Sequence, residues 1–463
     1  MPDMNRRHLP RPITAGAILT LVIALLACVA RSASAQQAAA DSAIRLTLGD
    51  AVRLAARQNA AVEGAMARVD AAKARVTERR ADLLPNISAA VAERGSTINS
   101  ATFPIEFPTV PGQKPLFDPN GSILGPVNTF DARARISQSL YDPAARTRVQ
   151  TARTGVAAAN ADVASLADQA STIAANAYLS VLRADAVFTA RLADSTLAAE
   201  LLGIAQDQLK AGTGVALDVT RARSQLTGAR TQLIVARNER DRTRVDLARA
   251  LGLPLVRLEL VDALATLPSP PNAGGGTTLD SAVRSRKDVQ ALDLQARAAR
   301  EQANAIRDER LPTIGVFAGE GLSQRNGRSY LPTYDWGIQL SLPIFDGFRR
   351  EARVTEQVSA ARDLEIRARD LRSQVEADVR SATLNLRSSA EAVSAARERL
   401  ALAEQEVAQA RERFQAGVSG NADVITASIT LNTARTQVVD ALTSYQASRV
   451  ALARAQGSIA TID

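Results

Sequence analysis

Apolar residues recur every seven positions between residues 386 and 414, and this spacing predicts a helix that packs lengthwise against another helix. Large side chains occupy one heptad position (Leu386, Val393, Leu400, Val407 and Phe414) and small ones the other (Ser389, Ala396, Ala403 and Ala410). Alternating large and small layers favour a closely spaced coiled-coil seam. A simple antiparallel hairpin with the helix that follows would explain the same seam.

Two stretches without proline predict helices of unusual length. Asp142 and Pro143 provide an N-cap acid and a proline at the first helical position, and the next credible breakers are Gly212 and Gly214. The predicted bounds are 144–211 and 348–416 for the long helices, and 216–251 and 421–456 for the shorter return helices. At 1.5 Å per residue each long helix would span roughly 100 Å.

Between the helices, apolar and polar residues alternate with a period of two, which predicts two strand pairs at 86–140 and 313–344. The predicted apolar faces are Phe130, Ala132, Ala134, Ile136 and Leu140 in the first pair, and Tyr334, Trp336, Ile338, Leu340, Leu342 and Ile344 in the second. Ile87, Ala89 and Val91, and Ile314, Val316 and Ala318, mark the partner strands. Strands of about ten residues with one apolar face are typical of a transmembrane β-barrel. An ordinary half-exposed sheet would show the same alternation.

These patterns occur twice, because the chain carries an internal repeat. Residues 209–252 align without a gap on residues 414–457, with 18 of 44 positions identical. The repeat predicts the following organisation: signal peptide 1–35, first copy 36–252, linker 253–278, second copy 279–457 and tail 458–463. A unit of about 200 residues far exceeds the period of solenoid repeats and indicates duplication of a domain-sized unit. The linker needs no function beyond joining the copies.

The strand count limits how the chain can meet a membrane. A spanning sheet must pair every backbone group and leave no edge facing lipid. Four strands cannot close a barrel on their own. If these strands lie in lipid, several chains must therefore contribute to one barrel.

The N-terminus predicts export. Arg6, Arg7 and Arg11 precede an apolar run, and Ala33-Ser34-Ala35 forms a cleavage site. A membrane-anchoring helix is the alternative, and Leu26-Ala27-Cys28 raises the further possibility of lipidation at Cys28. Cleavage would remove the only histidine and the only cysteine.

A mature chain without histidine or cysteine lacks the usual residues for nucleophilic catalysis and for zinc or copper binding. We therefore expect no enzyme activity and no cofactor or metal site. The net charge is +8, of which the predicted signal contributes four arginines and one aspartate, leaving +5. Acidic and basic residues alternate along the helices, as in Arg397-Glu398-Arg399, which indicates solvated faces and no nucleic-acid binding.

The order of these features resembles the TolC family of outer-membrane efflux and secretion channels over about residues 46–457. The motifs are the opening Leu46-Thr47-Leu48 with Asn59, the Leu-Pro at both helix-to-strand passages, the strand exits Leu-Tyr-Asp-Pro and Ile-Phe-Asp-Gly, and the two Ala-Gly turns.

The resemblance implies a mainly α protein with long antiparallel coiled-coil helices and four transmembrane strands per chain. It implies a homotrimer with a 12-stranded β-barrel in outer-membrane lipid and a 12-helix tunnel in the periplasm. The implied function is a passive exit duct of a tripartite efflux or type I secretion system. Its implied partners are a periplasmic adaptor (membrane fusion) protein and an inner-membrane transporter.

The resemblance also assigns positions. The turns between long and return helices are the implied adaptor-docking sites, with Leu209, Gly212, Gly214, Phe414 and Gly417 as their residues. Asp218 and Asp423, with Arg221 and Thr426 three residues further on, are the implied periplasmic gate. The family's best-known pattern has two acids three residues apart, whereas Thr426 stands at the second position here. Asp423 as a mere cap of the return helix is an equal alternative.

Two other classes of function compete with the duct. A soluble periplasmic coiled-coil scaffold or adaptor would use the strands as an ordinary sheet. An envelope hydrolase based on serine and carboxylates would need a constellation such as Gly-x-Ser-x-Gly, which the sequence lacks.

Overall fold

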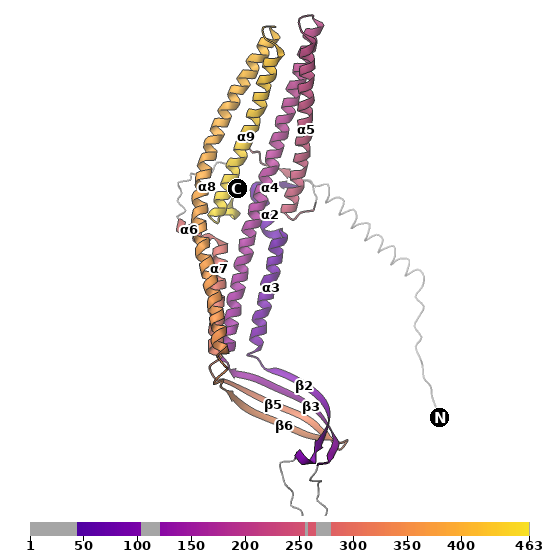
Figure 1. Ribbon diagram of the computed structural model, residues 1–463, viewed down its shortest axis with the longest axis vertical. Helices are drawn as coiled ribbons and strands as arrows, with labels where there is room; N and C mark the ends of the chain where they lie inside the picture. Colours follow the sequence, from indigo (N-terminus) through magenta and orange to yellow (C-terminus); the bar gives the residue numbers. More distant parts are fainter. Residues whose placement is uncertain (1–43, 103–120, 255–257, 265–278, 463) are drawn as a thin grey trace, which may run out of the picture. The chain divides into compact units, whose positions relative to one another are not determined.

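The computed structural model describes residues 44–102, 121–254, 258–264 and 279–462. The predicted signal peptide, with Cys28, lies outside these residues. Two long helices, α4 (Pro143–Lys210) and α8 (Arg349–Gln415), contain 68 and 67 residues. The return helices are α5 (Ala216–Ala250) and α9 (Asn421–Ala455), and Figure 1 shows them running back along α4 and α8. Over the described ranges, no helix is both long and apolar enough to cross a membrane.

The chain folds into two compact units, and neither coincides with a sequence copy. The first unit comprises residues 1–63, 166–286 and 374–463, and the second comprises 64–165 and 287–373. Each unit therefore combines segments from both copies. Strands and helices of one copy pack on those of the other.

The second unit contains an antiparallel sheet in the order β2-β3-β5-β6 (Figure 1). Its strands are β2 (Asn86–Asn99), β3 (Ile123–Tyr141), β5 (Thr313–Arg325) and β6 (Leu331–Ser341). A short 3-10 turn, η1 (Ser100–Thr102), follows β2. Helices α3 (Ala60–Ala81) and α7 (Lys287–Asp308) lead into β2 and β5. The strands β2 and β6 form the two open edges.

One face of this sheet is apolar and exposed. On this face the register pairs Ile87 of β2 with Ile136 of β3, and Val316 of β5 with Ile338 of β6. Ile87, Ile338 and Trp336 are 74%, 74% and 76% exposed. Side chains of this kind are normally buried, and none of the described residues covers this face.

The observed strands correct the predicted faces at three positions. A bulge in β3 leaves Leu140 as an extra residue, and Tyr141 is the residue aligned with Ile314 of β5. A bulge breaks the period of two, so counting alternate residues fails beyond it. Strand β6 ends at Ser341, so Leu342 and Ile344 lie outside the sheet.

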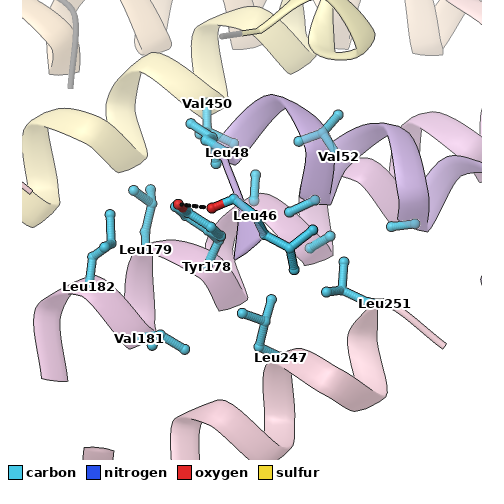
Figure 2. Packing of buried hydrophobic residues seen from close by; sticks show 14 of the residues in the cluster. Leu46, Leu48, Val52, Tyr178, Leu179, Val181, Leu182, Leu247, Leu251 and Val450 are labelled. Atoms are coloured by element: carbon cyan, nitrogen blue, oxygen red, sulfur yellow. Dashed lines mark hydrogen bonds between the residues drawn. The ribbon is translucent and has the colours of Figure 1, made fainter. Parts of the chain in front are cut away.

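The core of the first unit surrounds Tyr178 of α4, whose side chain is fully buried (Figure 2). Strand β1 (Ile44–Leu46) pairs in parallel with β4 (Leu258–Leu260). Helix α2 (Leu48–Gln58) follows β1, and a capping box between Thr47 and Asp50 begins it. The Tyr178 hydroxyl donates to Leu46 O at 3.0 Å and lies 2.8 Å from Asp262 Oδ2.

The predicted linker and the predicted C-terminal tail both contribute residues to this core. Leu258 and Leu264, from the predicted linker, are buried in it. So are Ile459, which begins the turn η2 (Ile459–Thr461), and Ile462 from the predicted tail. The short helix α6 (Leu279–Ser285) is joined to the end of α9 by a 2.6 Å hydrogen bond from Ser285 Oγ to Gln456 O. The assignment of a joining role alone to residues 253–278 is therefore wrong.

The heptad positions of α8 are buried or half-buried, as their spacing predicts. Ala403 and Val407 pack with Ala427, Leu431 and Ala434 of α9. The hairpin with the return helix therefore accounts for part of the seam, as the simpler alternative proposed.

Candidate gate and docking turns

The two turns that join long and return helices have the same backbone geometry. Gly212 and Gly417 have φ values of 79° and 72°. In the first turn, Thr213 N donates to Gln208 O at 3.0 Å, and in the second Val418 N donates to Arg413 O at 3.0 Å. This is the Schellman arrangement, which needs a left-handed residue and therefore favours glycine. The predicted role of both glycines in reversing the chain agrees with this geometry.

Gly214 serves a different purpose from Gly212. A Cβ atom at Gly214 would lie 3.0 Å from the backbone and Cβ of Gln208. Close approach of two backbone segments, and not a left-handed conformation, explains this glycine. Ser419 occupies the equivalent position of the second turn, where the hydrogen bond from its amide to Arg413 O is longer, at 3.4 Å.

Hydrogen bonds and an ion pair connect the two helical hairpins near the turns. Gln208 Nε2 donates to Phe414 O at 3.0 Å, and Asn421 Nδ2 donates to Asp218 O at 3.0 Å. Arg411 pairs with Glu200 at 3.1 Å. Asn421 is fully buried, so its hydrogen bond links the first turns of α5 and α9 directly. A displacement of one hairpin relative to the other must break this bond.

The four predicted gate residues lie in two unequal environments. Asp218 is half-buried and lies 3.8 Å from the guanidinium of Arg221, which is half exposed. Asp423 is exposed, and Thr426 uses its hydroxyl to bond Ala422 O within α9. Arg221 thus neutralises Asp218 in the first copy. In the second copy Thr426 has no charge, so it leaves Asp423 unneutralised.

Asp423 does not cap its helix. The N-cap of α9 is Gly420, and no side chain makes a capping hydrogen bond there. Asp423 is the third helical residue, where it can interact only with the helix dipole. The alternative that Asp423 is merely a cap is therefore wrong, and an exposed carboxylate remains at the end of the hairpin.

The predicted docking residues divide into exposed and buried. Leu209 is 40% exposed, whereas Phe414 is only 3% exposed and packs with Leu201 and Val424. Phe414 is therefore not available to a partner, because the heptad that ends at this residue continues into the core. The turns also expose three apolar residues that were not among the predicted docking residues: Val215, Leu217 and Val418. Their position beside the glycine turns was the sequence signal that could have indicated an exposed apolar surface.

The polar face of the sheet carries an ion-pair cluster that the sequence analysis also missed. Arg133 of β3 reaches across β5 to Asp335 of β6 at 3.0 Å, and Arg135 pairs with the same carboxylate at 2.9 Å. The intervening positions of β5 are Gly319 and Gly321. A Cβ at Gly319 would lie 2.6 Å from Asp335 Oδ1. The glycines therefore make room for side chains of β3 and β6 to meet over β5.

Comparison with known proteins connects these features to a family. The family model described as Outer membrane efflux protein matches residues 51–253 and 278–458. The chain is 24% identical over 355 residues to Outer membrane protein TolC of Escherichia coli, covering 72% of this chain and 70% of that protein. It is 26% identical over 250 residues to Alkaline protease secretion protein AprF of Pseudomonas aeruginosa, covering 52% and 51%.

Among solved structures, the outer-membrane channel OprN superposes with a TM-score of 0.73 at 18% identity, covering 89% of this chain and 90% of that one. At this identity the likeness concerns the fold, and the family assignment rests on the matched family model, which covers most of the chain. The chain belongs to the outer membrane efflux protein family, a family of outer-membrane channels and not of enzymes.

Proposed function

We propose that this protein is the passive exit duct of a tripartite efflux or type I secretion system, and that three copies form one channel. The observation that carries this proposal is the four-stranded sheet with an exposed apolar face and two open edges. Lipid would cover the face, and neighbouring copies would pair with the edges. Three chains of four strands would give a closed 12-stranded barrel with no edge facing lipid.

The dimensions and side chains of the sheet suit this role. Strands β5 and β6 contain 13 and 11 residues, and a tilted transmembrane strand needs about 9–11. Tyr334 and Trp336 lie next to each other on the apolar face, where aromatic residues would contact the membrane interface. A solvated sheet would not leave residues such as Ile338 exposed in a continuous row.

The turn region supports docking of a periplasmic adaptor, which would link the duct to an inner-membrane transporter. Val215, Leu217 and Val418 give the two turns exposed apolar surface, and the shared Schellman geometry offers two similar docking positions per chain. With three chains, an adaptor would meet six such positions. A soluble scaffold or adaptor would use the same turns without entering a membrane.

Extraction and conductance of the full-length protein test the proposal. We expect the protein in the outer-membrane fraction, released by detergent as a trimer that heat dissociates into monomers. The purified trimer should form pores in a planar lipid bilayer. Release of monomer by osmotic shock alone, or a detergent-extracted trimer without conductance, would contradict the duct.

We further propose that Asp423 lines the periplasmic gate. Three copies of this exposed carboxylate would form a ring that attracts multivalent cations. Thr426→Asp restores a second acid and should strengthen block of the pore by a divalent or trivalent cation about tenfold, whereas Asp423→Asn should remove most of it. The measurement is single-channel current at increasing cation concentration on the side of the turns. Equal block in wild type and Asp423→Asn would exclude a gating role.

A further inference from the structure

A cavity of about 1110 Å³ lies within the second unit, against one side of α3, α4 and α7. Figure 1 shows α4 between α3 and α7 in this unit. The floor of the cavity consists of small residues, among them Ala152, Gly155 and Ala159 of α4. A Cβ atom at Gly155 would meet nothing within 4 Å, so the floor is open at this point.

The cavity lies along one side of α4. On α4, Thr151, Gly155 and Ala159 face it and are half-buried, whereas Arg153 and Ala157 on the opposite side are exposed.

Three arginines of α3 line one wall of the cavity: Arg68, Arg75 and Arg79. Their spacing of seven and four residues places them on one face of the helix, over a length of roughly 16 Å at 1.5 Å per residue. Within the described part of the chain, Arg79 approaches only Glu78, at 3.8 Å, and no carboxylate lies within 4 Å of Arg68 or Arg75.

The other charged side chains of the cavity largely pair with one another or with a neighbouring amide. Arg148 pairs with Asp142 and Glu309 at 3.5 and 3.6 Å, and Arg353 pairs with Glu309 at 2.9 Å. Asp162 accepts a hydrogen bond of 3.3 Å from Gln295. The remaining acid, Asp82, lies at the strand end of the cavity, beyond the last turn of α3.

We propose that this cavity binds organic anions that carry an apolar body. The guanidinium groups of α3 would hold carboxylate, sulfonate or phosphate groups, and the alanine and glycine floor would accept the apolar part. Charge-assisted bonds from arginine to such groups are among the stronger hydrogen bonds in proteins, and the three arginines present several such donors along one face of α3. The inference rests on the proposed function: in a duct whose lumen faces this side of the helices, the site would name a class of solute that passes through it.

The test uses the full-length protein in detergent and 1,5-naphthalenedisulfonate, a rigid dianion with an apolar ring system. We expect binding in isothermal titration calorimetry that weakens as salt is raised. The triple variant Arg68→Gln, Arg75→Gln, Arg79→Gln should weaken it at least about tenfold. Gly155→Phe, which fills the floor and keeps the arginines, should weaken it as well.

A matched control removes the same charge from other faces of the helices. Arg80, Arg153 and Arg307 are exposed and do not line the cavity. Their replacement by glutamine should leave binding unchanged. Equal affinity in wild type and the cavity variant, or equal losses in cavity and control variants, would overturn the proposed site. Conductance measured on the same samples separates this result from a failure of the duct, because a protein that conducts without binding the dianion refutes only the site.

Discussion

Ile338→Lys is expected to abolish the detergent-extracted trimer, whereas Gln339→Lys leaves it intact. The two residues are neighbours in β6 and point to opposite faces of the sheet, and both are exposed within one chain. A lysine on the lipid face of a barrel costs up to about 2–4 kcal/mol, a cost that rises from the interface toward the midplane. A trimer contains three such lysines, so the total cost would be about three times as large.

The measurement is the amount of heat-dissociable trimer in the outer-membrane fraction, compared at equal expression. We expect Ile338→Lys to lower it more than tenfold and Gln339→Lys to change it by less than half. A sheet in water would tolerate both lysines, since surface substitutions usually change stability by no more than about 0.5 kcal/mol. Similar amounts of trimer in the two variants would therefore place the apolar face outside lipid.

This pair of variants also separates the duct from the soluble scaffold. Both functions allow the long helices, the turns and the adaptor contact, because all of these lie outside the sheet. Only the duct requires that one face of β6 differ energetically from the other after assembly. The sheet is thus the part of the molecule in which the two functions make opposite predictions.

Local sequence signals predicted the parts of the fold that depend on short-range order. The bounds of α4, α5, α8 and α9 differ by at most one residue from the predicted ones, because proline, glycine and helical periodicity act within a few residues. The alternation in β6 likewise predicted its exposed face. The prediction for β3 failed at Leu140, since a bulge leaves no signal in the alternation of apolar and polar residues.

The parts of the fold that could not be predicted depend on contacts between residues far apart in the sequence. Strand β4 contains only three residues, and its partner β1 lies more than 200 positions earlier in the chain. Nothing in Leu258-Glu259-Leu260 distinguishes a buried parallel strand from part of a linker. The same holds for Asp262, whose role becomes visible only once Tyr178 and the amide of Leu48 are placed beside it.

The candidate gate was predictable in position but not in environment. The repeat aligns Asp218 with Asp423 and Arg221 with Thr426, so it indicates where the copies differ. It does not reveal that Asp218 is half-buried and Asp423 exposed, because burial depends on the packing of both hairpins. Phe414 was predicted both for the heptad seam and for the docking turn, and it lies in the core, as the seam requires.

Tyr178→Phe is expected to destabilise the core of the first unit by about 1–3 kcal/mol, because it removes a buried hydroxyl whose proton is shared between a backbone carbonyl and a carboxylate. The hydroxyl contacts Leu46 O and Asp262 Oδ2, and Asp262 Oδ2 also accepts from Leu48 N at 2.9 Å. One side chain thus joins β1, the start of α2 and the segment after β4. The measurement is the guanidinium midpoint of the helical circular dichroism signal. Tyr445→Phe is the control, since no hydrogen bond of its hydroxyl is observed in the described structure.

Alkaline pH provides a second measurement on the same pair of proteins. Burial, and then the hydrogen bond with Asp262, raise the pKa of Tyr178 above its ordinary value of 10.0. Above pH 10 the unfolded chain loses a proton that the folded chain keeps, so the free energy of unfolding falls as pH rises. Tyr178→Phe lacks this dependence, and its deficit relative to wild type should shrink steadily above pH 10. A deficit that stays constant between pH 8 and pH 11 would show that the hydroxyl titrates normally and that the buried hydrogen bonds do not hold its proton.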